Sequence, residues 1–410
     1  MNLSNLKNLI SNIGHNSSNL KLGCHNLVVF LSIPVALLIC VISPIINVQF
    51  YKIRRDRIGH FVADSAILLA LKSLHGKKYL YLPWFDGEAS NTYFNDKVNR
   101  VLHVNKVTRF VAKANNLLSC GDKHNSFNNY GSRDTDCILY KTKNIKSSYF
   151  RFNLNENRLG FEYLGRNGFN QGDKFVCLMV RDSAYLDSMQ SNNDWKYHNY
   201  RDSSIHTYKL MAEELVRRGY FVIRMGKVVK EKFESKSKKI IDYAFSNDRS
   251  DFLDIWLMSN CFFCVTTATG LDKVCSASRV PQVFVNSLPL CSMTSFDHCI
   301  WASKKLFWKS TGNLLTMNET LDKNYFNSQD YFRDFIDIVD LNDEEIKDIV
   351  MEMEEKLTGK WRESSVDQVM QMKFWKIFKQ HKNYKKYNNC IHPNAQYATS
   401  FLRNNPHWLV

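Results

Sequence analysis

The chain of 410 residues is longer than most single domains, so two domains that each bury a core are expected. With 44% hydrophobic and 23% charged residues, and only 16 Gly and 7 Pro, the composition excludes a collagen-like or wholly disordered chain. The net charge of +15 favours an anionic partner. No nucleic-acid-binding motif accompanies this charge, so phosphate or lipid is the expected partner and nucleic acid is not.

The eleven cysteines show no spacing that indicates a paired framework. The single CxxC motif, Cys261 with Cys264, has no second pair that could complete a metal site and is interpreted as part of a buried strand. Free thiols in the core are therefore expected, and they favour a reducing compartment.

Residues 27–46 form an uncharged and almost wholly apolar segment. As a helix, these 20 residues would span about 30 Å, the thickness of a bilayer core. Pro34 and Pro44 weaken such a helix, so a bent or re-entrant insertion is an alternative to a transmembrane helix. A cleaved signal peptide is less favoured, because the run is long and Pro44 directly follows Ser43. Residues 1–26 read as a disordered tail.

Basic residues on the two sides of this segment predict its orientation. Two lysines precede it, whereas Lys52, Arg54, Arg55 and Arg57 follow it. By the positive-inside rule the C-terminal side is cytoplasmic. We therefore expect a single-pass protein of the inner (cytoplasmic) membrane with the domains that follow the segment on the cytoplasmic side.

The region after the anchor has a β/α pattern. It predicts a helix over residues 58–74, a strand over 78–82 and a helix over 91–102. Residues 115–170 are dense in Asn, Gly and Ser and predict loops that lead to a domain boundary near 167–173. This pattern and boundary lead us to expect an N-terminal Rossmann-like domain over residues 50–168.

The second half alternates strand and helix more clearly. Residues 175–180 are a continuous apolar run, as buried parallel strands require. A helix follows, with Ser203 or Ser204 placed to cap it and Gly219 placed to end it. Further strands are expected over 220–223, 261–265 and 282–285, and further helices over 249–260 and 270–278. The pattern predicts an α/β fold with a doubly wound parallel sheet over 169–330 and a helical extension over 331–410.

Polar residues follow the predicted strands, and in such a sheet ligands bind beyond the carboxyl ends of the strands. Arg181 and Asp182 follow the first strand, Arg224 and Gly226 the second, and residues 266–271 the third. Guanidinium groups and helix N-terminal amides both suit phosphate oxygens, so these three strand ends predict a diphosphate site. The alternative is that Arg181 only forms a structural ion pair, with Asp182 or Asp254.

Several of these stretches resemble known glycosyltransferases. Residues 250–286 resemble the donor-binding segment of heptosyltransferase-like GT-B enzymes, and residues 53–60 resemble their opening strand and loop, which typically contains Arg-Leu-Gly-Asp. Residues 181–185, 194–203, 223–226, 249–255 and 401–409 more closely resemble a family of bacterial glycosyltransferases from surface polysaccharide loci. The resemblance begins near Ile53 and is thin between about residues 91 and 167.

The resemblance implies a GT-B fold, with two Rossmann-like domains facing a cleft and a membrane anchor in front. It implies transfer of a sugar from a nucleotide-sugar to a glycan or lipid-linked acceptor in cell-surface polysaccharide synthesis. The donor-binding residues would be Arg181, Arg224, Gly226, Asp254, Thr267, Thr269, Gly270 and Leu271. Ala268 stands where the broader superfamily often has an acidic residue, so that donor contact is lost or supplied elsewhere, for example by Asp272.

The resemblance also implies a catalytic group, in which His60 would act with Arg181 and Asp182. His60 replaces the Asp that is the catalytic base of the heptosyltransferase-like enzymes, and an imidazole can also accept a hydroxyl proton at neutral pH. The alternative for His60 is a capping or packing role. The residues expected to contact the acceptor or the sugar are Tyr185, Trp195, His198, Arg201 and Asp202, although this stretch could instead be a packed surface loop.

No metal-binding pattern is recognised in the sequence, so no cofactor and no metal are expected. Arginines and helix dipoles would stabilise the departing diphosphate. Two other functions are kept open: a catalytically silent glycan-binding or assembly protein, and a sugar-nucleotide epimerase on the same fold. Near the end, Lys373, Lys376 and Lys379 recur at helical spacing, either on the solvated face of a core helix or as a contact with anionic lipid.

Overall fold

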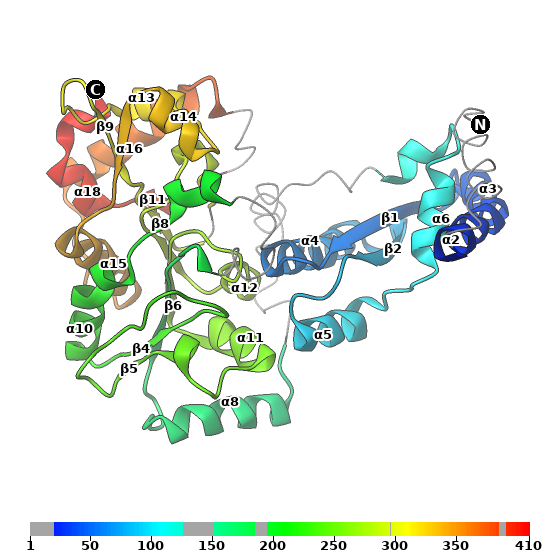
Figure 1. Cartoon of the computed structure of the whole chain (residues 1–410), viewed down its shortest axis with the longest axis horizontal. Helices are drawn as coiled ribbons and strands as arrows, with labels where there is room; N and C mark the ends of the chain where they lie inside the picture. Colours follow the sequence, from blue (N-terminus) through cyan, green and yellow to red (C-terminus); the bar gives the residue numbers. More distant parts are fainter. Residues whose placement is uncertain (1–19, 126–150, 185–194, 296, 385–390) are drawn as a thin grey trace. The chain divides into compact units, whose positions relative to one another are not determined.

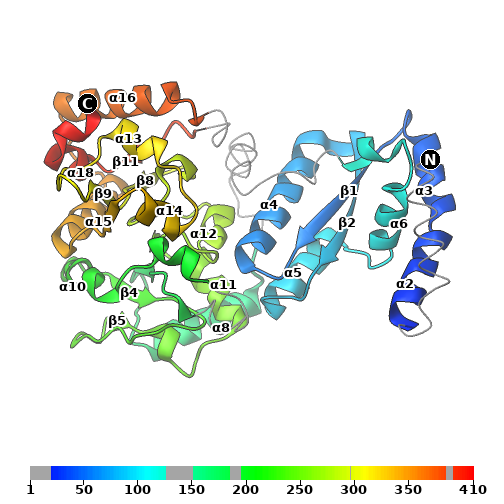
Figure 2. The ribbon, with the colours of Figure 1, turned by 45° about the horizontal axis from the view of Figure 1, so that its top comes forward.

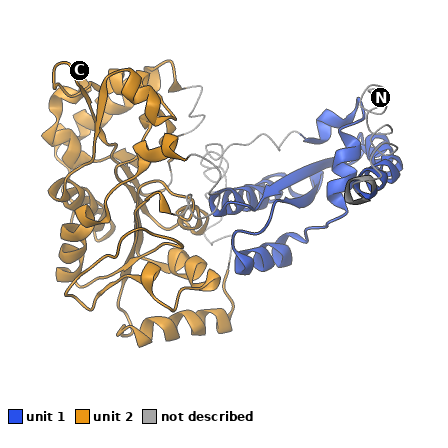
Figure 3. Cartoon of the chain, in the orientation of Figure 1, with its two compact units in different colours: residues 1–144 blue, residues 145–410 orange. Residues whose placement is uncertain are grey.

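A computed structural model of the protein describes residues 20–125, 151–184, 195–295, 297–384 and 391–410 (Figure 1). The chain divides into two compact units, Met1–Asn144 (unit 1) and Ile145–Val410 (unit 2) (Figure 3). Most of the predicted disordered tail lies outside the described residues, and so does Tyr185.

Unit 1 contains one βαβ unit. Strands β1 (Asn47–Arg54) and β2 (Tyr79–Asp86) pair in parallel, and α4 (Ile58–His75) with the short η1 (Gly76–Lys78) connects them. The helices α5 (Thr92–Leu102) and α6 (Thr108–Asn115) and the turn η2 (Gly121–Asn125) follow. Two of the expected elements, α4 and α5, lie within a residue of their predicted bounds. In the part of unit 1 that the structure describes, two paired strands take the place of the larger Rossmann-like sheet that the sequence suggested.

The apolar N-terminal segment forms two helices, α2 (Leu20–Leu31) and α3 (Ile33–Ile42). The break is at Ser32, whose hydroxyl donates to the Val28 carbonyl at 2.7 Å, and Pro34 lies in the first turn of α3. Residues Cys24–Ile42 are long and apolar enough to cross a membrane, with a mean hydropathy of 2.4. The helix break agrees with the expectation that proline interrupts this segment.

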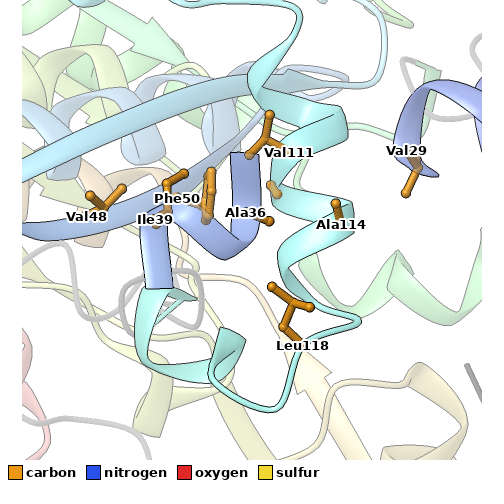
Figure 4. Packing of buried hydrophobic residues seen from close by; sticks show 9 residues of the cluster. Val29, Ala36, Ile39, Val48, Phe50, Val111, Ala114 and Leu118 are labelled. Atoms are coloured by element: carbon orange, nitrogen blue, oxygen red, sulfur yellow. The ribbon is translucent and has the colours of Figure 1, made fainter. Parts of the chain in front are cut away.

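One side of α2 and α3 is part of the core of unit 1 (Figure 4). Val29, Ala36 and Ile39 are buried there against β1 and α6. The residues that complete this cluster are Val48, Phe50, Val111, Ala112, Ala114 and Leu118. The segment therefore differs from a transmembrane helix surrounded by lipid, because α6 covers one of its faces.

A disulfide joins Cys40 of α3 to Cys120 beyond α6, with 6.3 Å between the Cα atoms. The expectation that the cysteines are free is therefore wrong for this pair, because packing of α3 on α6 brings together two cysteines that are distant in sequence. Seven other cysteines among the described residues are free, and all except Cys24 are buried. Cys264 lies within a buried strand as predicted, and Cys261 just precedes that strand.

Unit 2 is built on a parallel sheet of seven strands in the order β11-β8-β7-β6-β3-β4-β5. Its strands are β3 (Phe175–Met179), β4 (Phe221–Arg224), β5 (Ile240–Ile241), β6 (Phe263–Thr266), β7 (Gln282–Phe284), β8 (Cys299–Trp301) and β11 (Ala395–Tyr397). The four predicted strands occupy the middle of this sheet, so the α/β fold with a doubly wound parallel sheet is confirmed. Both views show α10 (Lys209–Arg217) and α15 (Asp343–Leu357) on one face of the sheet, with α11 (Asp251–Asn260) and α12 (Lys273–Ser278) on the other (Figures 1 and 2).

The helix α8 (Leu154–Arg166) also belongs to unit 2, although its residues read as loop in the sequence. Asn153 and Glu156 form a capping box at its start. Its contact with the core is through Trp256, whose indole Nε1 donates to Asn157 Oδ1 at 3.1 Å and whose ring faces Gly160. The division between the units therefore precedes α8, at residues 144/145, and does not follow it near residue 167.

Residues 331–410 were expected to form a helical extension. In the structure they are part of unit 2 and contribute to its sheet. The strand β11 completes one edge of the sheet, and an antiparallel pair, β9 (Lys305–Trp308) with β10 (Ile336–Val339), adds a small second sheet. In α16 (Ser365–Gln380), Phe374 and Phe378 are buried while Lys373, Lys376 and Lys379 are exposed. The remaining elements are η3 (Lys196–Arg201), η4 (Ile205–Tyr208), η5 (Tyr243–Phe245), η6 (Leu290–Ser292), α13 (Met317–Asp322), α14 (Ser328–Arg333), α18 (Thr399–Asn404) and η7 (Pro406–Leu409).

Candidate functional site

The carboxyl ends of β3, β6 and β8 hold a group of polar residues in unit 2. We call Arg181, Arg201, Asp202, Lys304 and the turn of residues 267–272 the strand-end cluster. Arg181 follows β3, the turn follows β6, Lys304 follows β8, and Arg201 and Asp202 come from the end of η3. Three strands that are distant in sequence thus bring their following residues to one edge of the sheet, as the topology requires.

Arg181 connects two parts of this cluster. Its backbone amide donates to Thr267 Oγ1 at 2.8 Å, which fixes the end of β3 to the turn after β6. Its guanidinium Nε donates to Asp202 Oδ1 at 3.1 Å. The Arg181 and Asp202 side chains are 14% and 25% exposed, so solvent can still reach the pair. Arg181 thus forms an ion pair, as the structural alternative expected, but its partner is Asp202 and not Asp182 or Asp254.

The turn after β6 is shaped by Asp272. Its Oδ2 accepts from Thr266 Oγ1 at 3.0 Å and from the Thr269 amide at 2.7 Å. Ala268 lies between them with φ of 59°, a conformation that is costly for a residue with a Cβ. Asp272 Oδ1 and Thr269 Oγ1 are buried and have no hydrogen-bond partner among the described residues. These two oxygens are the atoms of the turn that a ligand could satisfy.

Arg201 and Lys304 supply the other cationic groups. Arg201 donates from a guanidinium NH2 to the Ala268 carbonyl at 2.6 Å, so it lies against the turn. Lys304 is 4% exposed; its ammonium forms an ion pair with Asp340 at 2.8 Å and donates to the Asp202 carbonyl. The sequence did not indicate Lys304 and Asp340 as site residues. The strand β8 before Lys304 has only three residues, too few to show the apolar pattern of a buried strand.

Buried and half-buried charges of both signs meet in the cluster, where the cations of Arg181, Arg201 and Lys304 lie near the carboxylates of Asp202, Asp272 and Asp340. Burial, reinforced by the positive charge of Arg201, lowers the pKa of Arg181. Burial also lowers the pKa of Lys304 and raises the pKa of Asp202, although Arg181 opposes the latter shift. The two guanidinium groups therefore repel each other, with the Asp202 carboxylate as the only one bonded to either of them among the described residues. An anionic ligand would relieve this repulsion.

Two predicted donor-binding residues, Arg224 and Asp254, have other partners. Arg224 is 1% exposed and its guanidinium pairs with Asp242 at 3.1 Å, so the structure does not bring it together with Arg181 and Arg201. Asp254 is 5% exposed and accepts from Arg249 at 2.6 Å and from the Tyr243 hydroxyl at 3.0 Å. Burial raises the pKa of Asp254 to about 6. The ion pairs Arg224–Asp242 and Arg249–Asp254 are contacts within unit 2. A donor contact by Arg224 or Asp254 stays a prediction.

Two other predicted residues have a local structural role. A Cβ on Gly226 would lie 2.5 Å from Val229 Cγ1, so the loop after β4 has no room for a larger residue there. Asp182 accepts from the Ala184 amide at 3.0 Å and from the Lys230 amide at 2.8 Å. In this arrangement its carboxylate orders the two loops after β3 and β4. Of the remaining residues assigned to the donor, Thr267, Thr269, Gly270 and Leu271 all lie in the turn.

The predicted sugar-binding stretch forms η3 and a row of aromatic rings. Trp195 is buried and its ring stacks with those of Tyr197 at 6.0 Å and His198 at 6.2 Å between centroids. A cavity of about 670 Å³ lies beside them. Its lining consists of Lys196, Tyr197, Asn327, Ser328, Gln329 and Phe332. Residues of α14 thus belong to this region, and no local pattern could have shown it because they are far away in sequence.

His60 lies in the first turn of α4 in unit 1, within the helix predicted over residues 58–74. Close to it, Asp64 accepts a bidentate ion pair from Arg54, at 2.9 Å to Nε and 2.7 Å to NH2. Burial and the positive charge of Arg54 lower the pKa of His60, while Asp64 opposes this. The imidazole is therefore neutral at pH 7 and able to accept a proton.

Over the described ranges, no three His, Cys, Asp or Glu side chains come together as a candidate metal site. The cationic side chains of the strand-end cluster are the groups that could face a diphosphate there.

Comparison of the sequence with known protein families gives no match, and the curated proteins give none either. Among solved structures, the chain is similar to a glycosyl transferase family 9 protein from Veillonella parvula, at 10% identity and a TM-score of 0.41, over 63% of this chain and 86% of the other. It is also similar to ADP-heptose lps heptosyltransferase II of E. coli, at 11% identity and a TM-score of 0.30, over 59% and 86%. A third similar structure, described as a UDP-N-acetylglucosamine 2-epimerase from Listeria monocytogenes, has 7% identity and a TM-score of 0.26, over 58% and 79%. At these scores the superpositions are loose, so the function is argued from the chain's own residues.

Proposed function

We propose that the protein is a glycosyltransferase that moves a sugar from a nucleotide-activated donor to a glycan or lipid-linked acceptor. One observation carries the proposal. Two mutually repelling guanidinium groups lie at the ligand-binding edge of a parallel sheet: that of Arg201 bonds the turn after β6, and that of Arg181 is held by Asp202. A diphosphate is the kind of ligand whose charge and oxygens such a pair suits.

The strand-end cluster would then hold the donor and stabilise its leaving group. As the bond between the sugar C1 and the diphosphate oxygen breaks, negative charge grows on the departing nucleoside diphosphate. Arg181 and Arg201 would neutralise that charge directly, and Lys304 would add to the positive potential from its buried position. In this role the cationic side chains take the place of a metal ion, so we expect full activity in the presence of a chelator.

His60 is our candidate for the general base. A neutral imidazole would accept the proton of the acceptor hydroxyl while that oxygen forms its bond to the sugar C1. The lowered pKa of His60 supports this role, because the unprotonated form is then the main one at pH 7. Arg54, held by Asp64, keeps positive charge near the imidazole and so favours its neutral form.

The aromatic cavity beside η3 is our candidate for part of the sugar or acceptor site. Tyr197 and Phe332 offer ring faces there, and Asn327, Ser328 and Gln329 offer hydrogen-bonding groups. This mixture suits sugars, whose apolar ring faces alternate with hydroxyl groups. The resemblance to enzymes of surface polysaccharide loci supports a role in the synthesis of a cell-surface glycan.

A screen of nucleotide-sugars by thermal shift tests the proposal. A bound donor raises the melting temperature by mass action, and the shift grows with donor concentration. At least one nucleotide-sugar should stabilise the protein, and its nucleoside diphosphate should compete with it. Absence of any shift would favour the silent assembly protein, whereas conversion of the donor sugar without an acceptor would favour the epimerase.

A further inference from the structure

The two N-terminal helices have one protein-covered side and one bare side. Val29, Ala36 and Ile39 are buried against α6 and β1, whereas the opposite side is apolar and open. The exposed apolar residues of this segment are Leu27, Val28, Phe30, Leu31, Val35, Leu37, Leu38, Val41, Ile45 and Ile46. Between Lys21 and Lys52 the sequence has no Asp, Glu, Lys or Arg. We call this side the bare face of α2–α3.

The contacts on the covered side of the segment argue against a membrane-crossing orientation. In α6, Lys113 hydrogen-bonds His25 of α2 at 2.7 Å, so a lysine and its helix lie directly against the apolar segment. At the other end, Lys123 Nζ donates to Ser43 Oγ at 2.5 Å, and the disulfide from Cys40 to Cys120 ties α3 to the same region. A transmembrane orientation would draw α6 and its lysine into hydrocarbon, where an ammonium group is costly.

The short connection from α3 to β1 also keeps the segment against unit 1. Asn47, the first residue of β1, comes five residues after Ile42, the last of α3, and Val48 and Phe50 share a core with Ala36 and Ile39. The segment is therefore not a separate helix that projects from unit 1. It is one layer of the unit: one side packs against β1 and α6 (Figure 4), and the other side presents exposed apolar side chains.

We propose that α2 and α3 lie in the plane of a membrane and dock unit 1 onto an anionic bilayer through the bare face, without crossing it. The aliphatic and Phe side chains of that face enter the boundary between headgroups and acyl chains. Lys113 of α6 and Lys123 of η2 bond His25 and Ser43 and so add positive charge near the two ends of the segment, which favours an anionic surface. The proposal does not rest on the proposed transferase activity.

Charge is the reason for preferring lipid over a second copy of the chain. Lys113 and Lys123 place a positive charge near each end of the segment, so two copies that met through their bare faces would bring like charges closer in either a parallel or an antiparallel arrangement. An anionic lipid surface is complementary to both ends and to the uncharged middle. A bilayer also accepts a face of this length without requiring matched side-chain shapes.

The first test is topology, with the full chain carrying a cleavable tag at each terminus. Sealed membrane vesicles from expressing cells, prepared in both orientations, are treated with an impermeant protease. In-plane docking puts both tags on the same side, so both are cleaved in one vesicle orientation and both are protected in the other. Cleavage of one tag with protection of the other in the same vesicles would show a crossing and would overturn the proposal.

The second test changes the bare face alone. Leu38→Asp with Val41→Asp places two charges on exposed positions, and Leu154→Asp with Val366→Asp is a matched control at exposed apolar positions of unit 2. The purified full chains are co-sedimented with vesicles of phosphatidylglycerol and phosphatidylcholine, and with phosphatidylcholine alone. We expect at least a tenfold loss of binding for the first variant, none for the control, and weaker binding of the parent to the neutral vesicles.

Sedimentation velocity and circular dichroism of the same proteins complete the test. If the bare-face variant is folded and still binds vesicles like the parent, the proposal is wrong. It is also wrong if the parent is a dimer that the variant converts to a monomer while vesicle binding is unchanged, because the bare face is then a protein interface.

Discussion

Replacement of Arg181 separates its structural role from its proposed role in donor binding. In Arg181→Gln, the nucleoside diphosphate would lose a charge-assisted hydrogen bond in a partly buried site, worth about 1.5 to 3 kcal/mol. That free energy corresponds to a roughly 10- to 150-fold weaker dissociation constant. The variant also leaves the Asp202 carboxylate, only 25% exposed, without its guanidinium partner. We therefore expect unfolding free energy to fall as well, by about 1 to 3 kcal/mol.

A second substitution distinguishes these two losses. Asp202→Asn in the Arg181→Gln background removes the unpaired carboxylate, so it should recover most of the lost stability while donor affinity stays low. Arg217→Gln is the matched control, because Arg217 is an exposed arginine that pairs with Glu214 on the surface.

Titration calorimetry with the nucleoside diphosphate and urea denaturation provide the two measurements. Unchanged affinity in a folded Arg181→Gln protein would refute the reasoning, and so would recovery of affinity together with stability in the double variant. In the first case the phosphates bind elsewhere; in the second, the arginine acts only by holding the loop of Asp202.

Three further predictions follow from the structure. His60→Ala should lower turnover by about a hundredfold or more with nucleotide affinity intact, whereas His60→Asp keeps part of the activity; the acid limb of the parent's kcat/KM profile should lie below pH 6.5, and a normal rate in a folded alanine variant would exclude the base role. Gly160→Ala should lower unfolding free energy by about 1 to 3 kcal/mol, because the new Cβ would lie 2.2 Å from the ring of Trp256. Gly165→Ala in the same helix has open space and should be neutral or stabilising in the same denaturation assay; equal effects would mean that α8 does not pack as described. Since the pKa of Asp254 is raised to about 6 in the folded protein, its contribution to stability is present below about pH 4 and is lost as pH rises through 6. The stability difference between parent and Asp254→Asn should thus favour the parent more at pH 4 than at pH 7.5 in urea titrations, and a difference that does not vary with pH would contradict the assignment.

The sequence was sufficient for the elements with long or continuous apolar patterns. The strand over Phe175–Met179 and the helix α11 were predicted because burial on both faces of a sheet selects unbroken apolar runs, and because Ser250 is a good N-cap. The edge strands β5 and β11 and the short inner strand β8 were missed, since two or three residues carry no detectable period. The strands that were found are those that the sheet buries most.

The candidate site was predictable only in part. The position of Arg181 after a strand pointed to the correct edge of the sheet, but its partner Asp202 and the nearby Lys304 come from segments whose approach depends on tertiary packing. Arg224 shows the opposite error: its place after a strand is the same kind of signal, yet its side chain is directed to Asp242. A position at a strand end predicts where the backbone lies, and the local loop then decides where the side chain points.

The place of β11 in the sheet has a consequence for how the protein is made. This strand pairs only with β8, and the chain between them first builds β9, β10 and helices α13 to α16. During synthesis β8 is therefore an open sheet edge until the residues of β11 leave the ribosome, and an open edge is a template for pairing with other chains. Truncated or stalled chains that lack residues 395–397 should thus aggregate, and a chaperone that covers strand edges would be needed most at that late stage of synthesis.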